Sequence, residues 1–164
     1  MKIITKTISA LTMALFTGCI DNQDSGAKEY PIQTTLEAGN MRSEFDANLA
    51  KWKASKVELY RFQVDMQCYC FPMGWMDIIV RRGLVAEVDS VPGELKLFEP
   101  NQVAYAPTIE SLFDRIEPKL YDPDYTVKIE YDSTFGYPKS IEIRQNGNLK
   151  DAGLSASVVR LAPL

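Results

Sequence analysis

Residues 60–70 alternate apolar and polar side chains without a break, and this pattern constrains the fold more than any other stretch of the chain. Successive side chains of a strand point to opposite faces of a sheet, so the alternation predicts a β-strand with one buried face. We expect the rest of the domain to be built against this strand. The apolar members are Tyr60, Phe62, Val64, Met66, Cys68 and Cys70; the polar members, which we expect on an open binding face, are Arg61, Gln63, Asp65, Gln67 and Tyr69.

Two amphipathic helices are predicted on either side of the first group of strands. Asn40 can act as the N-cap of the first helix, whose apolar stripe recurs at helical spacing and comprises Met41, Phe45, Leu49 and Trp52. Thr108 is predicted to cap the second helix, which Pro118 limits in length. Its inner face comprises Ile109, Leu112, Phe113, Ile116 and Leu120.

Five further strands follow from alternation and from turn residues. The first strand is expected to begin at Val57 and to be broken at residues 71–74, which contain Pro72 and Gly74. The other strands are predicted at residues 75–81, 84–90, 125–131, 139–144 and 155–161, with a tight turn at Arg82 and Gly83. Residues 92–107 form a long connection, which we interpret as either a packed loop or a binding loop. The elements together predict an α+β fold in the order αβββ-αβββ, an antiparallel β-sheet of about six strands with two helices packed on one face.

The N-terminal residues are typical of an export signal. Lys2 and Lys6 precede an apolar run at residues 8–16, which is shorter than the about 20 residues that span a bilayer. The small residues Thr17 and Gly18 before Cys19 resemble the lipobox of bacterial lipoproteins, in which the cysteine carries acyl chains such as palmitate. An ordinary signal peptide with a chance cysteine is the alternative. We therefore expect a lipoprotein signal peptide at 1–18, a flexible tether at 19–39 and a single α+β domain at 40–164.

Composition and charge narrow the classes of function. The chain contains no histidine, which excludes nucleophile–histidine pairs, histidine-ligated zinc and a histidine general base. Removal of residues 1–18 takes two of the 18 basic residues and leaves 16 against 22 acidic ones, a formal charge of −6. Such a charge repels phosphate backbones, so we expect no nucleic-acid partner.

Several segments resemble one family of bacterial lipoproteins, the domain of unknown function 6174. They are the lipobox cysteine, Trp52 before residues 60–62, the strand that ends in the two cysteines, residues 107–113 and residues 131–138. The resemblance covers roughly residues 40–161 and implies the fold and a location in the cell envelope, but no reaction. In proteobacterial lipoproteins an aspartate directly after the acylated cysteine signals retention in the inner membrane. Since Ile20 occupies that position here, the resemblance implies the outer membrane, facing the periplasm.

Cys68 and Cys70 are the residues of the mature chain whose chemistry most clearly suggests a specific role. In an oxidising compartment they can form a disulfide, although residues two apart on a regular strand are about 6.5–7 Å apart, at the limit for such a bond. Buried free thiols or a functional thiol or metal site remain as alternatives. A Cu(I) site would use soft sulfur donors, but methionines also commonly fill gaps in cores. The sulfur cluster comprises Met66, Cys68, Cys70, Met73 and Met76.

Three pairs of acidic residues lie close together in the sequence: Asp114 with Glu117, Glu130 with Asp132 and Asp122 with Asp124. None brings a second catalytic group with it, and we identify no catalytic residue, metal site or cofactor. We therefore predict a membrane-anchored envelope lipoprotein that is a non-catalytic binding or interaction module. Its partners would be the membrane, through the N-terminal lipid, and an envelope protein or a small ligand. The alternative is a thiol-redox or Cu(I)-binding protein that uses the Cys-x-Cys strand.

Overall fold

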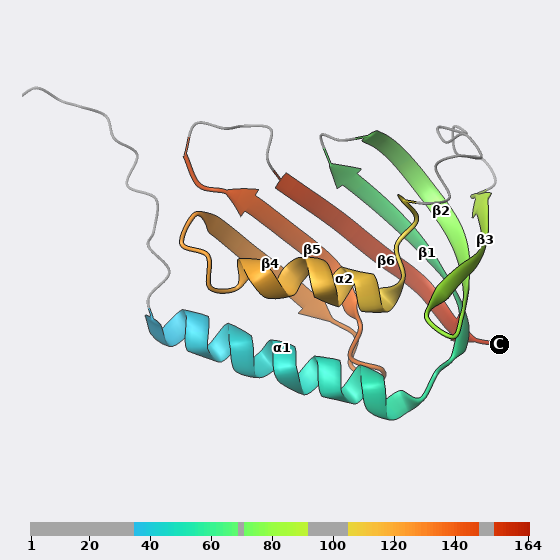
Figure 1. Ribbon diagram of the computed structural model, residues 1–164, viewed down its shortest axis with the longest axis horizontal. Coiled ribbons are helices and arrows are strands. Elements are labelled where there is room, and N and C mark those ends of the chain that lie inside the picture. The colour runs from blue at the N-terminus through green and yellow to red at the C-terminus, as the bar shows by residue number, and fades with distance from the viewer. Residues whose placement is uncertain (1–34, 69–70, 92–104, 148–152) are drawn as a thin grey trace, which may run out of the picture.

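The computed structural model describes residues 35–68, 71–91, 105–147 and 153–164. Six antiparallel strands form one sheet in the order β3-β2-β1-β6-β5-β4 (Figure 1). With two α-helices, the chain has the α+β class expected from its sequence. The elements are α1 (Thr35–Ser55), β1 (Leu59–Cys68), β2 (Phe71–Arg81), β3 (Leu84–Ser90), α2 (Ile109–Ile116), the 3-10 helix η2 (Glu117–Lys119), β4 (Tyr125–Tyr131), β5 (Pro138–Gln145) and β6 (Gly153–Pro163).

β1 lies in the middle of the sheet, as the alternation predicts. It pairs with β2 on one side and with β6 on the other, and β6 joins the first three strands to the last three. The apolar members from Tyr60 to Met66 are buried, whereas Arg61 and Gln67 are exposed and Gln63 and Asp65 half-buried. The two faces of β1 therefore divide as expected, and Tyr69 lies outside the described residues.

Several element ends differ from the prediction by one or two residues, and two boundaries, the starts of α1 and β2, differ by more. α1 begins at Thr35 rather than after Asn40, so Asn40 lies inside the helix and is not its N-cap. Residues 36–38 are good helix formers, and a Cβ at Gly39 would meet nothing within 4 Å, so the helix continues through Gly39. The helix also includes the last five residues of the expected tether, 35–39.

β1 ends before residues 71–74, as expected, but these residues form the start of β2, which therefore begins at Phe71 rather than at residue 75. β3 pairs with β2 only from Met76 onward, so among the described strands Pro72 belongs to a part of β2 that pairs with β1 alone. Proline is tolerated in such edge positions because it has no N–H to donate. The pairing of β1 with β2 shifts between Val64 and Met66, opposite Gly74 and Trp75, so an irregularity absorbs the extra residues.

The predicted turn and cap of the remaining elements are confirmed. Arg82 and Gly83 both have positive φ angles, 52° and 75°, which matches the twist of a two-residue hairpin between β2 and β3. Thr108 accepts a hydrogen bond from the backbone N–H of Ser111, and the Ser111 side chain accepts one from the N–H of Thr108. α2 ends at Ile116, two residues before Pro118, and the chain continues as η2.

The helices contribute their predicted stripes to one continuous core. From α1, Phe45 and Trp52 are buried, and Met41 and Leu49 pack against the core while partly exposed. The Phe45 ring meets Phe113 of α2 edge-on at 5.5 Å. The predicted inner face of α2, with Leu120 just beyond it, is buried in full. Within the described residues, neither helix is long and apolar enough to cross a membrane.

Candidate functional site

The polar face of the sheet is built around a buried carboxylate, that of Asp77. Only 7% of the surface of this residue is exposed. Its partner across the strands is Gln63, so the two side chains share a face. The Arg61 guanidinium donates from Nε to Asp77 Oδ1 at 2.6 Å and from Nη2 to Oδ2 at 2.9 Å, and Gln63 Nε2 donates to Oδ2 at 3.1 Å. Two of the predicted binding-face residues are therefore held in place by an acid that sequence analysis did not single out.

Electrostatics keep this cluster ionised. The hydrogen bonds from Arg61 lower the pKa of Asp77 below its ordinary value, and this outweighs the opposing effect of burial. The charge of Arg160 lowers it further. Arg160 has a φ of 56° and lies where the pairing of β1 with β6 shifts between Arg61 and Gln63, so an irregularity in β6 places a second cation near Asp77. In the sequence, the only signal for this site is an acid inside an apolar strand.

Serines occupy the middle of the same face. The register places Ser157 opposite Asp65, Ser140 opposite Ser157, and Ser155 opposite Gln67. Ser155 and Ser157 are exposed, and Ser140 is half-buried. Charged side chains follow along β5, where Glu142, opposite Ser155, forms an ion pair with Arg144. We call this surface the polar sheet face; it comprises Arg61, Gln63, Asp65, Gln67, Asp77, Ser140, Glu142, Ser155 and Ser157.

A second polar cluster joins three elements on the core side. Glu110 at the start of α2 accepts a 3.0 Å hydrogen bond from the Trp52 indole of α1 and a 2.8 Å bond from the Tyr60 hydroxyl of β1. The same hydroxyl accepts a 3.1 Å bond from the N–H of Ile109, one of the donors that a helix start leaves unpaired. Burial, followed by the charge of Glu110, raises the pKa of Tyr60, so the phenol remains a neutral donor. We interpret this cluster as structural, because it holds α1, β1 and α2 together.

The segment 131–138, one of the parts that carry the family resemblance, is also structural. Asp132 Oδ1 accepts hydrogen bonds from the N–H groups of Thr134 and Phe135, which fixes the turn between β4 and β5. Gly136 has a φ of 78°, and a Cβ there would lie 2.6 Å from the Asn48 carbonyl oxygen of α1. Glycine is therefore required both for the backbone conformation and for close approach of the turn to the helix.

The sulfur cluster is only partly described. Met66 and Met76 are buried in the core, with 1% of each exposed. Cys68 is the last residue of β1, while Cys19 and Cys70 lie outside the described residues, so the lipidation and the thiol pair stay predictions. In the ranges that the structure describes, no group of three or more acidic or cysteine side chains is arranged to hold a metal ion.

Comparison with known proteins gives one match. The sequence model of DUF6174, a family of unknown function, matches residues 44–163. This range begins inside α1 and includes the polar sheet face, the Glu110 cluster and the turn at Gly136. No curated protein and no solved structure matches the chain.

Proposed function

Since the chain belongs to the DUF6174 family, a family of unknown function, its role is inferred from its own residues, and we propose that it is a non-catalytic binding protein of the cell envelope. In this proposal both helices cover one face of the sheet, and a protein partner docks on the other, the polar sheet face. The observation that carries the proposal is the run of short side chains in the middle of that face.

Serine is a poor choice for stability alone at an exposed position in the middle of a sheet. β-branched and aromatic residues fit a pleated surface better, and the difference between residue types reaches about 1 kcal/mol. Ser140, Ser155 and Ser157 instead keep the centre of two neighbouring strands, β5 and β6, low and supply hydroxyls that both donate and accept hydrogen bonds. A partner's backbone could therefore approach the sheet closely, with the longer charged side chains around it.

The Asp77 cluster supports the same proposal. Asp77 holds the Arg61 guanidinium through two hydrogen bonds, while 53% of the Arg61 side chain stays exposed. A guanidinium fixed in this way loses little conformational entropy when a partner binds to its remaining N–H groups. Preorganised polar groups beside a low, hydroxyl-rich centre suit a hydrogen-bonding protein partner more than an apolar one.

The test is site-specific photo-crosslinking in intact cells, with a photoreactive residue at Gln67 on the polar sheet face and, as a control, at Ser43, an exposed residue of α1. We expect one defined envelope protein to be captured from Gln67 and not from Ser43. Ser155→Lys, which raises the low centre, should abolish the capture, whereas the matched Ser43→Lys should leave it unchanged. Equal capture from both positions, or capture insensitive to Ser155→Lys, would contradict the proposal.

We propose that acyl chains on Cys19 attach the protein to the outer membrane, with the domain facing the periplasm. Each buried methylene contributes about 0.8 kcal/mol to membrane attachment. Metabolic labelling with an alkyne fatty acid tests this: the full-length protein should be labelled and recovered with outer membranes, and Cys19→Ser should be unlabelled. An unlabelled wild-type protein would contradict the anchor without affecting the docking proposal.

Thiol-redox function is a second candidate, because Cys68 is the last residue of β1 and a single residue separates it from Cys70 in the sequence. Cys70 itself lies outside the described residues. A disulfide that closes so short a loop is expected to be strained and more easily reduced. A Cu(I) site is less favoured, because two of its proposed donors, Met66 and Met76, are buried among core side chains. A turnover that Cys68→Ser abolishes would support the redox candidate over the binding protein.

A further inference from the structure

A pocket of about 420 Å³ lies between the C-terminal half of α1 and the facing side of α2, from Glu110 to Glu117 just past its end. This volume falls within the range of small-molecule sites. It shares no residue with the polar sheet face, so it is independent of the proposed docking surface. Its apolar lining comprises Leu49, Trp52, Val57 and Phe113.

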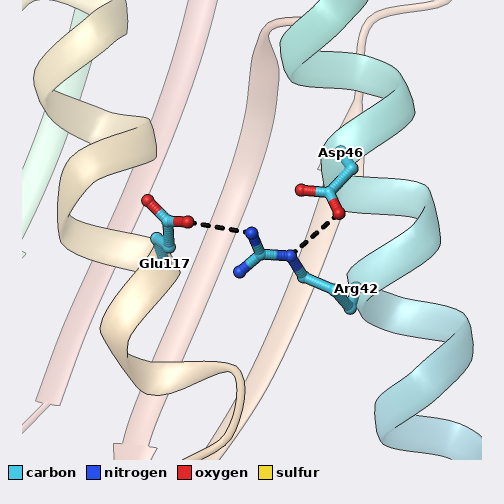
Figure 2. Close-up of polar contacts among 3 residues, drawn as sticks. All are labelled: Arg42, Asp46 and Glu117. Carbon is cyan, nitrogen blue, oxygen red and sulfur yellow. Dashed lines mark hydrogen bonds and ion pairs between the residues drawn. The ribbon is translucent and has the colours of Figure 1, made fainter.

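Six charged side chains complete the lining, and two of them are already engaged. Glu110 accepts hydrogen bonds from Trp52 and Tyr60. Glu117 accepts a 3.0 Å bond from Arg42, which also bonds Asp46 at 2.9 Å and so ties α1 to the end of α2 (Figure 2). These contacts fix the distance between the helices at the pocket.

The other four charged side chains are two cations and two anions. Lys53 and Lys56 come from the C-terminal end of α1 and the residue after it, Glu58 from the following connection, and Asp114 from α2. Across the described ranges, none of the four takes part in an ion pair, and all are exposed. The pocket thus combines an apolar lining with unpaired charges of both signs.

We propose that this pocket binds a small zwitterion with an apolar body, an amino acid or a short peptide with free ends. The ligand's carboxylate would bind between Lys53 and Lys56, its ammonium group between Asp114 and Glu58, and its side chains the apolar lining. Complementary charges of both signs distinguish this ligand from a simple anion, a simple cation or an uncharged apolar molecule. Fixed helices make the site preformed, which lowers the entropic cost of binding.

Calorimetric titration of the full domain with leucine and with leucyl-leucine tests the proposal and distinguishes the two sources of this chemistry. We expect at least one to bind, and N-acetyl-leucyl-leucine and leucyl-leucine amide, which each lack one charge, to bind about tenfold more weakly. Equal binding by the blocked peptides would overturn the proposal, since it would indicate an apolar groove only. Absence of binding by both free zwitterions up to millimolar concentration would also overturn it.

Variants locate the site. Lys53→Gln and Asp114→Asn remove one charge of each sign at exposed positions, so the fold should persist, as a thermal melt would verify. Each should weaken the free peptide about tenfold, and Lys53→Gln should leave the amidated peptide unchanged. Lys128→Gln, on β4 and outside the pocket, is the matched control. Unchanged affinity in both pocket variants would overturn the assignment.

Discussion

The hydroxyl of Tyr60 on β1 donates a 2.8 Å hydrogen bond to Glu110 at the start of α2, 50 residues along the chain. Through the same carboxylate, Trp52 of α1 is joined to both. Three elements therefore depend on one side chain, and the Trp52 and Tyr60 rings meet edge-on at 5.2 Å beside it. The arrangement fixes α1, α2 and the central strand relative to one another.

Removal of the Tyr60 hydroxyl should destabilise the domain. Tyr60→Phe leaves the Ile109 N–H without its partner and Glu110 with one donor fewer, so we expect the free energy of unfolding to fall by about 1–3 kcal/mol. Urea denaturation measures this change. A double-mutant cycle with Glu110→Gln should show coupling between the two sites, and strict additivity would contradict the shared hydrogen bond.

Tyr131→Phe should not destabilise the domain as Tyr60→Phe does. The Tyr131 hydroxyl is buried and finds no hydrogen-bond partner among the described residues, while its ring stacks on Phe113 at 6.4 Å. Removing an unpaired buried hydroxyl relieves its desolvation cost and keeps the ring, so stability should stay unchanged or rise by up to about 1 kcal/mol. The same denaturation experiment compares the two variants, and a loss as large as that of Tyr60→Phe would indicate that the Tyr131 hydroxyl has a partner.

Gly136→Ala should cost more than Gly83→Ala, although both glycines have a positive φ, 78° and 75°. Both variants carry the strain of a left-handed conformation, about 1 kcal/mol. Only at Gly136 would the new Cβ also meet the Asn48 carbonyl at 2.6 Å, whereas nothing lies within 4 Å of Gly83. We expect a further loss of about 1–3 kcal/mol at Gly136, as for other overpacked sites. Equal losses in thermal melts would show that α1 moves away at no cost.

Asp77 should make stability depend on pH in the acidic range. Its pKa is lowered in the folded state, mainly by the hydrogen bonds from Arg61, so its contribution is present above the ordinary value of 3.8. The contribution is lost as pH falls from 3.8 through the lowered folded pKa. Asp77→Asn should reduce the free energy of unfolding by about 1–2 kcal/mol at pH 7 and by less below pH 3.8. Asp124→Asn, an exposed turn position, is the control, and a constant difference across pH would contradict the assignment.

Cys68 and Cys70 should be joined by a disulfide in protein purified from the periplasm without reductant. Intact-mass analysis should then find the chain two hydrogens lighter than its reduced form and resistant to alkylation until reduced. Cys68→Ser should leave Cys70 free to react with iodoacetamide. Two reactive thiols in the untreated wild-type protein would contradict the disulfide and would weaken the redox candidate.

The polar and apolar alternation of β1 and the helical spacing of α1 and α2 determined the type of each element, its buried face and the α+β class. Local chemistry also sufficed for the Thr108 cap and the turn at Arg82 and Gly83. These features depend on neighbours a few residues apart, which the sequence displays directly. The start of β2 was missed because the tolerance for Pro72 depends on where β3 ends.

Only the tertiary structure decided which distant residues meet. The pairing of β1 with β6, the ion pair of Asp77 with Arg61 and the convergence of Trp52 and Tyr60 on Glu110 join residues 16 to about 100 positions apart. No local pattern encodes such contacts, because they depend on which strand edges pair and on how the helices pack. The sequence therefore determined the polar residues of β1, while the fold selected the acid that holds them and the serines beside them.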